Sequence, residues 1–319
     1  MGILNITFSL LPSEHLQKKI QSEFPGVSFH FSKGIDHAKE AFMDSEVFVT
    51  FGEDLTPEWI INAPKLKWIM VMSAGLEKMP FKECRERGIL VTNVKGIHKI
   101  PMAEFTIGTM LQHVKSMRQL WENEAIDLWD RKVPMGELHG KTVLILGAGA
   151  IGGEIARLAK AFGMNTFGVN RSGRPAEYMD KIFTVNHFHD SIPEADFLVS
   201  VLPSTKETQY LLTGREIGLM KKEAAFINIG RGDVINEDVL HDALKNGTIS
   251  HAYLDVFEEE PLPKGHAFWM MENVTVTPHL SGITKKYLPR AFEIFERNLN
   301  KYVNKETDFE NTVNLERGY

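Results

Sequence analysis

The sequence predicts an α/β protein built from two doubly wound parallel sheets, and three observations lead to this prediction. Short apolar, β-branched runs alternate with helical patterns along the chain, which is the order of strands and helices in a parallel sheet. The alternation occurs in two series, separated by a long helical stretch. The chain has 319 residues, enough for two domains of ordinary size.

The first series occupies roughly residues 3 to 94. Its strand-like runs are ILNITFSL, VSFHF, VFVTFG, LKWIMVM and ILVTNV. The segments between them, PSEHLQKKIQSEF, HAKEAFMDS and LTPEWIINAP, have helical spacing or begin with residues that start helices. We expect a sheet covered by helices on both faces.

A long helical pattern follows the first series. Pro101 suits a first helical position. From Ala103 to Trp121 apolar residues recur every three or four positions, so we expect one helix there. Its stripe would face the core, and part of it could form a subunit interface.

The second series begins at residues 141–147, KTVLILG, and continues through NTFGVN, ADFLVSVL, AAFINIG, SHAYLDVF and VTVTPH. The last stretch, KKYLPRAFEIFERNLNKYVN, has a helical pattern despite Pro289. We predict that residues 99–285 form a domain inserted into another, made of residues 1–98 and the returning helix of residues 286–319.

Composition narrows the class of protein. The net charge is −6 without long charge runs, which argues against nucleic acid as the main partner. No stretch approaches the ~20 apolar residues of a membrane span. Cys84 is the only cysteine, so no intrachain disulfide can form and a reducing, cytoplasmic location is expected.

A glycine-rich turn supplies the strongest local signal. Gly147, Gly149 and Gly152 form the pattern G-x-G-x-x-G between an apolar strand and an amphipathic helix, the context of a dinucleotide-binding Rossmann unit. The first glycine allows the tight turn, the second admits the pyrophosphate, and the third lets helix and strand pack closely. The helix N-terminus offers N–H groups to the phosphates.

The end of the next strand indicates which dinucleotide binds. An acidic residue there usually bonds the ribose of NAD, but this chain has Asn170, Arg171, Ser172 and Arg174. Asn170 removes a negative charge, and the other three can bond the 2′-phosphate of NADP. We expect NADP(H) to be preferred, with NAD(H) possible. The alternative is a solvated basic loop.

Ionisable residues follow three strands of the second series: Arg231, then Asp255 and Glu260, then His279. The carboxyl ends of parallel strands line the ligand crevice, so these side chains can converge. His187 and His189 suggest a metal by composition only, because no third ligand with suitable spacing accompanies them. We therefore expect no metal site.

With these segments in order, the sequence resembles the D-isomer-specific 2-hydroxyacid dehydrogenases over nearly its whole length. The matching motifs are VMSAGLEKMP, VTNVKGIHKIPMAEF, GAGAIG, VLPSTKET, NIGRGDVIN, LDVFEEEPLP and TPHLSG. The resemblance implies a Rossmann cofactor domain inserted in a flavodoxin-like substrate domain, and a homodimer is usual in the family.

The resemblance also implies site residues. Arg231 would bind the substrate carboxylate, Glu260 would be the partner acid, and His279 the acid–base histidine. Backbone N–H groups of Ser73, Ala74 and Gly75 would bind the carboxylate from the first domain. The remaining implied cofactor contacts are Gly147, Gly149, Ala150, Ile151, Gly152, Asn170, Arg171, Ser172, Arg174, Leu202, Pro203, Thr208, Ile229, Gly230, Asp255 and Gly282.

The expected activity is NAD(P)-dependent reduction of a small 2-keto acid of glyoxylate or hydroxypyruvate type to the D-2-hydroxy acid. Two alternatives stay open: a non-catalytic, dinucleotide-sensing protein like the corepressors of the family, and a short phosphoglycerate dehydrogenase. Glu260 stands where formate dehydrogenases have glutamine, which argues against that activity. Trp129 either packs locally or reaches a neighbouring subunit.

Overall fold

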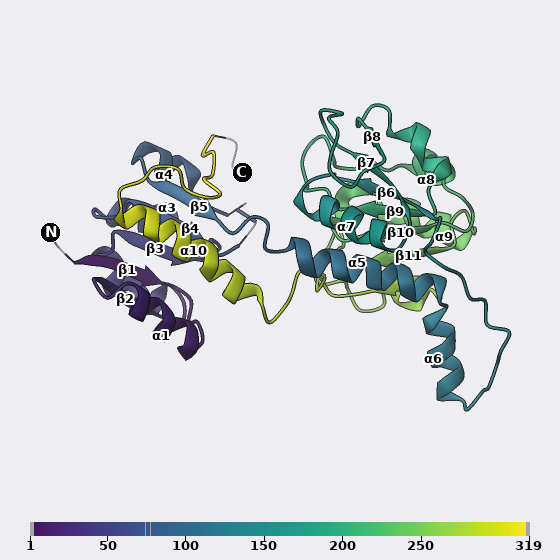
Figure 1. Ribbon diagram of the computed structural model, residues 1–319, viewed down its shortest axis with the longest axis horizontal. Coiled ribbons are helices and arrows are strands. Elements are labelled where there is room, and N and C mark those ends of the chain that lie inside the picture. The colour runs from purple at the N-terminus through teal and green to yellow at the C-terminus, as the bar shows by residue number, and fades with distance from the viewer. Residues whose placement is uncertain (1–2, 74, 77, 317–319) are drawn as a thin grey trace. The chain divides into compact units, whose positions relative to one another are not determined.

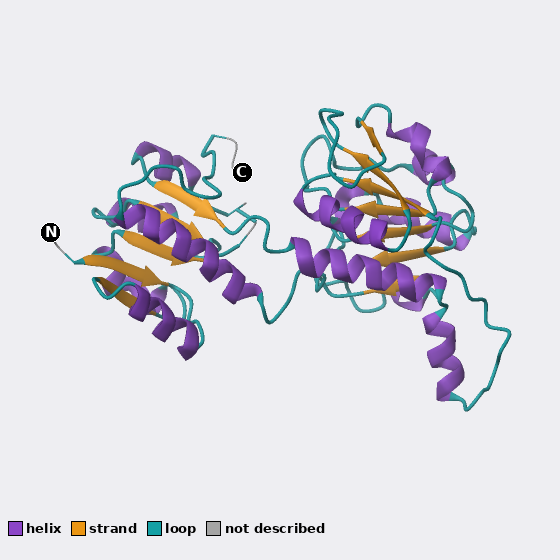
Figure 2. Ribbon diagram, viewed as in Figure 1, coloured by secondary structure: helices purple, strands orange, loops and turns teal. Residues whose placement is uncertain are grey.

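The computed structural model describes residues 3–73, 75–76 and 78–316. The chain divides into two compact units, one formed by Met1–Ile97 with Thr284–Tyr319 and the other by His98–Ile283. Each unit contains one sheet whose strands lie side by side with helices against its faces (Figure 2). The predicted fold class, two parallel-sheet α/β domains, is confirmed.

The sheet of the first unit has the order β2-β1-β3-β4-β5, and all its pairs are parallel. Strands β3 and β4 are buried along their whole length, as expected between two helical layers. The strands are β1 Leu4–Phe8, β2 Val27–Phe31, β3 Val47–Thr50, β4 Trp68–Val71 and β5 Leu90–Asn93, and the helices between them are α1 Glu14–Glu23, α2 Lys39–Met43, α3 Pro57–Asn62 and α4 Phe81–Glu86.

Helix α10, Tyr287–Val303, belongs to the first unit although it follows the whole second sheet in sequence (Figure 1). Its buried face packs on the first sheet, where Phe292 stacks on Phe8 with ring centroids 5.8 Å apart and Phe295 stacks on Trp68 at 5.6 Å. The burial of this apolar face explains why α10 groups with the first unit.

The sheet of the second unit has the order β12-β11-β10-β9-β6-β7-β8, again all parallel. Strand order reverses between β6 and β9, and ligands of such sheets bind beyond the strand ends at that point. The strands are β6 Thr142–Leu146, β7 Asn165–Val169, β8 Lys181–Phe183, β9 Phe197–Ser200, β10 Ala225–Asn228, β11 His251–Leu254 and β12 Val274–Val276. The three-residue edge strand β8 was not predicted.

The prediction of one helix from Pro101 to Trp121 is wrong. Helix α5 covers Lys99–Val114, and a separate helix α6 covers Met117–Ala125. Ser116 breaks the pattern with φ 46°, and its hydroxyl donates to the Pro134 carbonyl at 2.6 Å. This left-handed residue redirects the chain, which the apolar periodicity did not reveal.

The other helices of the second unit are α7 Ala150–Ala161, α8 Gly214–Gly218 and α9 Glu237–Lys245. Within the described part of the chain, no helix combines the length and apolar character needed to cross a bilayer.

Candidate active site

The glycine turn between β6 and α7 has the geometry that a dinucleotide needs. Gly147 has φ 106°, a conformation that favours glycine. A side-chain carbon added at Gly152 would collide with the Gly147 carbonyl oxygen, whereas one added at Gly149 would meet no heavy atom within 4 Å. Gly152 therefore serves close packing, and Gly149 leaves open space beside the N-terminus of α7. These residues fit a pyrophosphate.

The other predicted cofactor residues lie near the same strand ends. Ala150 and Ile151 form the first turn of α7. Leu202, Pro203 and Thr208 follow β9, and Thr208 Oγ1 donates to the Pro203 carbonyl at 2.6 Å. Ile229 and Gly230 follow β10, and a carbon added at Gly230 would lie 2.6 Å from the Leu202 carbonyl oxygen. The segments after β9 and β10 are thus in direct contact.

Residues Asn170–Arg174, which follow β7, form a segment that we call the arginine loop. Asn170 Oδ1 accepts hydrogen bonds from the Ser172 backbone N–H at 3.1 Å and from its hydroxyl at 3.3 Å. Asn170 Nδ2 donates to the Arg174 carbonyl at 2.9 Å. Both arginines are exposed, so their guanidinium groups are accessible beside the strand end.

His279 and Glu260, which follow strands β12 and β11, are hydrogen-bonded to each other. His279 Nδ1 lies 2.8 Å from Glu260 Oε2. The other carboxylate oxygen accepts a hydrogen bond from the Phe257 backbone N–H at 3.0 Å. This second bond fixes the orientation of the carboxylate. The two side chains are 50% and 37% exposed, so the pair is accessible to a ligand while its orientation is held.

Asp255 holds the loop that carries His279. It is 1% exposed at the end of β11. Its Oδ1 accepts from the Thr277 hydroxyl at 2.5 Å and from the Leu280 N–H at 2.9 Å, and its Oδ2 accepts from the Ser281 N–H at 2.9 Å. His279 itself has φ 53°, so this network compensates for an uncommon backbone conformation.

Arg231 follows β10, and hydrogen bonds connect it to the end of that strand. Its Nη1 donates to the Gly230 carbonyl at 2.8 Å, and Asn228 Nδ2 donates to the Arg231 carbonyl at 2.9 Å. A side-chain carbon at the next residue, Gly232, would collide with the Phe257 carbonyl. The Arg231 segment therefore packs directly on the backbone that precedes Glu260.

His98 is a site neighbour that sequence reasoning missed. A carbon added at Gly282 would lie 2.9 Å from His98 Cδ2. Burial, and then the charge of Arg231, lower the pKa of His98 from its usual value. No spacing rule could have found it, because it precedes α5 and lies far from Arg231 in sequence.

Glu258 is a second residue whose contacts the sequence did not indicate. The Tyr210 hydroxyl donates to it at 2.9 Å, and the Glu237 N–H donates to it at 3.0 Å. Glu258 thereby connects the segment before Glu260 to the N-terminus of α9.

The predicted residues of the first unit follow β4. The Gly75 N–H donates to Ser73 Oγ at 3.2 Å. The preceding backbone is held by the Tyr287 hydroxyl, which donates to the Met72 carbonyl at 2.8 Å. Ala74 lies outside the described residues.

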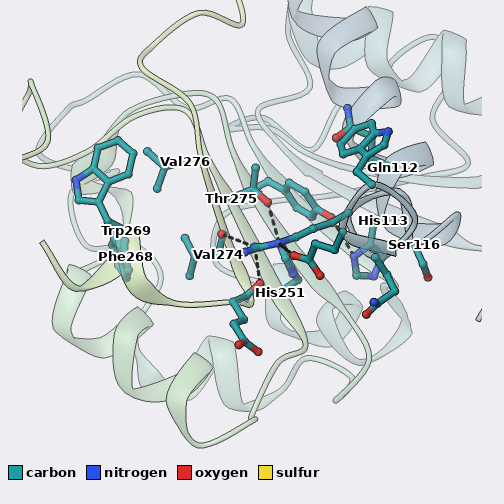
Figure 3. A pocket seen from close by; sticks show the side chains of 15 residues that line it. Gln112, His113, Ser116, His251, Phe268, Trp269, Val274, Thr275 and Val276 are labelled. Carbon is teal, nitrogen blue, oxygen red and sulfur yellow. Dashed lines mark hydrogen bonds and ion pairs between the residues drawn. The ribbon is translucent and has the colours of Figure 1, made fainter. Parts of the chain in front are cut away.

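A groove of about 710 Å³ lies elsewhere on the second unit, between α5, α6 and the strands β11 and β12 (Figure 3). His251 Nε2 lies 3.0 Å from Thr275 Oγ1, and Arg118 donates to the Glu272 carbonyl at 2.6 Å. None of the predicted site residues lines it, so it is a separate feature. Among residues 3–73, 75–76 and 78–316, no cluster of three metal-ligating side chains occurs.

Comparisons with known proteins agree with this arrangement. The family model "D-isomer specific 2-hydroxyacid dehydrogenase, NAD binding domain" matches residues 107–281. A D-3-phosphoglycerate dehydrogenase of Methanocaldococcus jannaschii is 36% identical over 280 residues, which cover 86% of this chain and 53% of that protein. A glyoxylate reductase of Thermococcus gammatolerans is 32% identical over 277 residues, covering 84% and 82% of the two chains.

Two solved structures are similar over nearly the whole chain. A D-isomer specific 2-hydroxyacid dehydrogenase family protein of Aeromonas salmonicida is 29% identical, with a TM-score of 0.86 and coverage of 98% of this chain and 100% of that one. An NADPH-dependent glyoxylate/hydroxypyruvate reductase of Sinorhizobium meliloti, in complex with NADP and sulfate, is 25% identical with a TM-score of 0.80 and 98% coverage of both chains.

Proposed function

Because the chain belongs to the D-isomer specific 2-hydroxyacid dehydrogenase family, we propose that it reduces a small 2-keto acid, of glyoxylate or hydroxypyruvate type, to the D-2-hydroxy acid with a nicotinamide cofactor. The observation that carries the proposal is the 2.8 Å contact between His279 Nδ1 and Glu260 Oε2. Relatives named glyoxylate reductase support the choice of substrate class.

The proton chemistry follows from this contact. A bound reduced nicotinamide would supply a hydride to C2 of the keto acid, and the carbonyl oxygen then needs a proton. Glu260 holds Nδ1 and stabilises the imidazolium, which leaves Nε2 of His279 to face the substrate oxygen. In the reverse direction the neutral ring takes the proton from the hydroxyl group.

Arg231 is proposed to bind the substrate carboxylate. A guanidinium can bind a carboxylate through two parallel hydrogen bonds, and it also stabilises charge that develops on the neighbouring oxygen. Its tie to Gly230 restricts the side chain before substrate arrives. The predicted contribution of Ser73, Ala74 and Gly75 from the first unit stays a proposal.

The cofactor proposal assigns the pyrophosphate to the turn of Gly147, Gly149 and Gly152, and the 2′-phosphate of NADP to the arginine loop. NADPH is the proposed preference, with NADH possible. The absence of a carboxylate at position 170 supports it, as does the NADPH-dependent relative of S. meliloti. Asp255 is proposed to act near the nicotinamide by keeping the His279 loop in place.

A homodimer is also proposed. Helix α6 and the loop after it extend away from the seven-stranded sheet (Figure 1). This arm exposes apolar side chains that a monomer would leave in water, above all Trp129 at 90% exposure. Two-fold dimers are the commonest soluble oligomers. Light scattering should give twice the mass of one chain; a monomer at micromolar concentration would refute this part.

A second candidate, phosphoglycerate dehydrogenase activity, is favoured by the 36% identity to the M. jannaschii protein. That relative is longer, and the match spans only 53% of it. The two candidates differ in the group attached to C2 of the keto acid, which is hydrogen or hydroxymethyl for the first candidate and a phosphorylated hydroxymethyl group for the second, so one assay can separate them.

The test is the oxidation of NADPH and of NADH, followed by absorbance, with glyoxylate, hydroxypyruvate, pyruvate and 3-phosphohydroxypyruvate. We expect turnover with glyoxylate or hydroxypyruvate. A marked preference for the phosphorylated substrate would establish the second candidate. Cofactor binding without turnover of any keto acid would instead favour the dinucleotide-sensing alternative.

The His279–Glu260 pair has its own test in Glu260→Gln. Turnover of the best keto acid should fall in this variant, because the carboxylate that stabilises the protonated ring is gone, while NADPH binding should stay at the wild-type value. Unchanged turnover would show that the pair does not act as proposed.

A further inference from the structure

The inference concerns how the arginine loop is held in shape. Its five residues follow β7, and Arg171, Ser172 and Arg174 are all exposed. Gly173 has φ 66°, a conformation that favours glycine. An exposed loop of this kind gains little stability from burial, so local hydrogen bonds have to define its conformation.

One side chain makes most of those bonds. The Asn170 amide accepts from the Ser172 N–H and hydroxyl through Oδ1 and donates to the Arg174 carbonyl through Nδ2. Ser172 Oγ in turn accepts a hydrogen bond from the Arg174 backbone N–H at 3.4 Å. Asn170 thus bridges the loop from its first residue to its last.

From this bridge we propose that Asn170 is a positioning residue for NADPH, which sets the cofactor preference by holding Arg171 and Arg174 in place. The inference rests on the proposed cofactor preference and deepens it. A loop that is ordered before binding does not lose its freedom when the 2′-phosphate arrives, so more of the interaction energy appears as affinity.

A simpler account is that Asn170 matters only because it is not an acid. The two accounts differ for alanine, which is uncharged and makes none of the three hydrogen bonds of Asn170. Aspartate cannot separate them, since it adds a charge and also loses the Nδ2 donor that reaches the Arg174 carbonyl.

The experiment measures binding of adenosine 2′,5′-bisphosphate and of AMP to the full-length protein by calorimetry, for the wild type and Asn170→Ala. The bisphosphate carries the 2′-phosphate and AMP does not. If Asn170 positions the loop, Asn170→Ala should weaken bisphosphate binding about tenfold, the size of one lost charge-assisted bond, and should leave AMP binding unchanged. The Michaelis constant for NADPH should rise while kcat stays the same.

Asn165→Ala is the matched control. Asn165 is the first residue of the same strand, and its Nδ2 donates to the Gly140 carbonyl at 3.2 Å, away from the loop. This variant should keep wild-type binding of both nucleotides. Thermal unfolding at the wild-type temperature in both variants would show that the fold is intact.

The outcomes separate the inference from the proposed function. If the wild type binds the bisphosphate no more tightly than AMP, the cofactor preference is wrong and the inference falls with it. If the wild type shows the preference and Asn170→Ala retains it in full, only the positioning role is overturned. A loss in Asn170→Ala that affects both nucleotides equally would also overturn it.

Discussion

The His279 loop, Thr277–Ser281, and the arginine loop both follow strands of one sheet, β12 and β7, but they are anchored at different depths. The His279 loop is held by Asp255, a carboxylate that is 1% exposed. The arginine loop is held by the amide of Asn170, among exposed neighbours. The histidine proposed to meet a substrate atom is therefore fixed from the core, whereas the residues proposed to select the cofactor lie on the surface.

This difference predicts how substitutions act. Changes around Asp255 should affect both stability and turnover, because buried hydrogen bonds are lost. Changes in the arginine loop should affect the choice of cofactor alone, since surface substitutions rarely alter stability by more than about 0.5 kcal/mol. The four predictions below test the contrast, from the largest expected effect to the smallest.

The largest effect is expected for His279→Ala. Reduction of the best keto acid should fall about 10²-fold or more, the scale of a lost general acid. NADPH affinity, measured by fluorescence, should stay at the wild-type value because the ring belongs to the substrate side of the proposed site. Retention of a tenth of the activity would remove His279 from the proton transfer.

Asp255→Asn should lower the free energy of unfolding by about 1–3 kcal/mol, the penalty of an unsatisfied buried group. An amide has one acceptor oxygen, so its NH₂ group would face a backbone N–H of the His279 loop. Turnover should fall as the loop shifts. The control is Asp242→Asn, whose side chain is 73% exposed. Equal free energies of unfolding in urea for both variants would show that the buried Asp255 stabilises the protein no more than an exposed carboxylate does.

Replacing both Arg171 and Arg174 with alanine should raise the Michaelis constant for NADPH about tenfold or more, through the loss of charge-assisted bonds. The constant for NADH and the unfolding temperature should stay near wild-type values. Arg215→Ala, an exposed arginine on α8, is the matched control. A similar loss with both cofactors would mean that the loop does not read the 2′-phosphate.

The smallest effect at neutral pH is expected for His251→Gln, on the strand that leads to Asp255. Burial, with smaller contributions from His113 and Arg118, lowers the pKa of His251 to about 3. Between that value and the ordinary pKa of histidine, the unfolded chain binds a proton at His251 that the folded chain does not. The contribution of the neutral ring to the free energy of unfolding is therefore fully present above about pH 6.5 and is lost as pH decreases.

Unfolding temperatures measured between pH 7 and pH 4 should therefore decline less steeply in His251→Gln than in the wild type. His187→Gln, at an exposed position of the same unit, should keep the wild-type slope. Parallel slopes for all three proteins would show that His251 does not contribute to acid sensitivity. The arginine loop has no part in this effect, so the measurement tests only the buried side of the comparison.

Much of the fold could be predicted because strand and helix patterns are local. The alternation of apolar runs predicted two parallel sheets, and the pattern around Pro289 predicted a final helix. The break at Ser116 could not be predicted from periodicity, since it depends on a hydroxyl bond to Pro134 across a loop. Strand β8 was missed because three residues at a sheet edge carry too little pattern.

The sequence by itself determined the residue types and their order: a glycine turn after a strand, a basic segment in place of an acid, and Arg231, Glu260 and His279 after strands of one series. Strand ends of a parallel sheet share an edge, so their order led to the expectation that these side chains converge. Only the tertiary structure decided what holds them. The carboxylate of Asp255 acts through contacts a few ångströms long with Thr277, Leu280 and Ser281, on a segment whose distance from Asp255 is not encoded in any spacing along the chain.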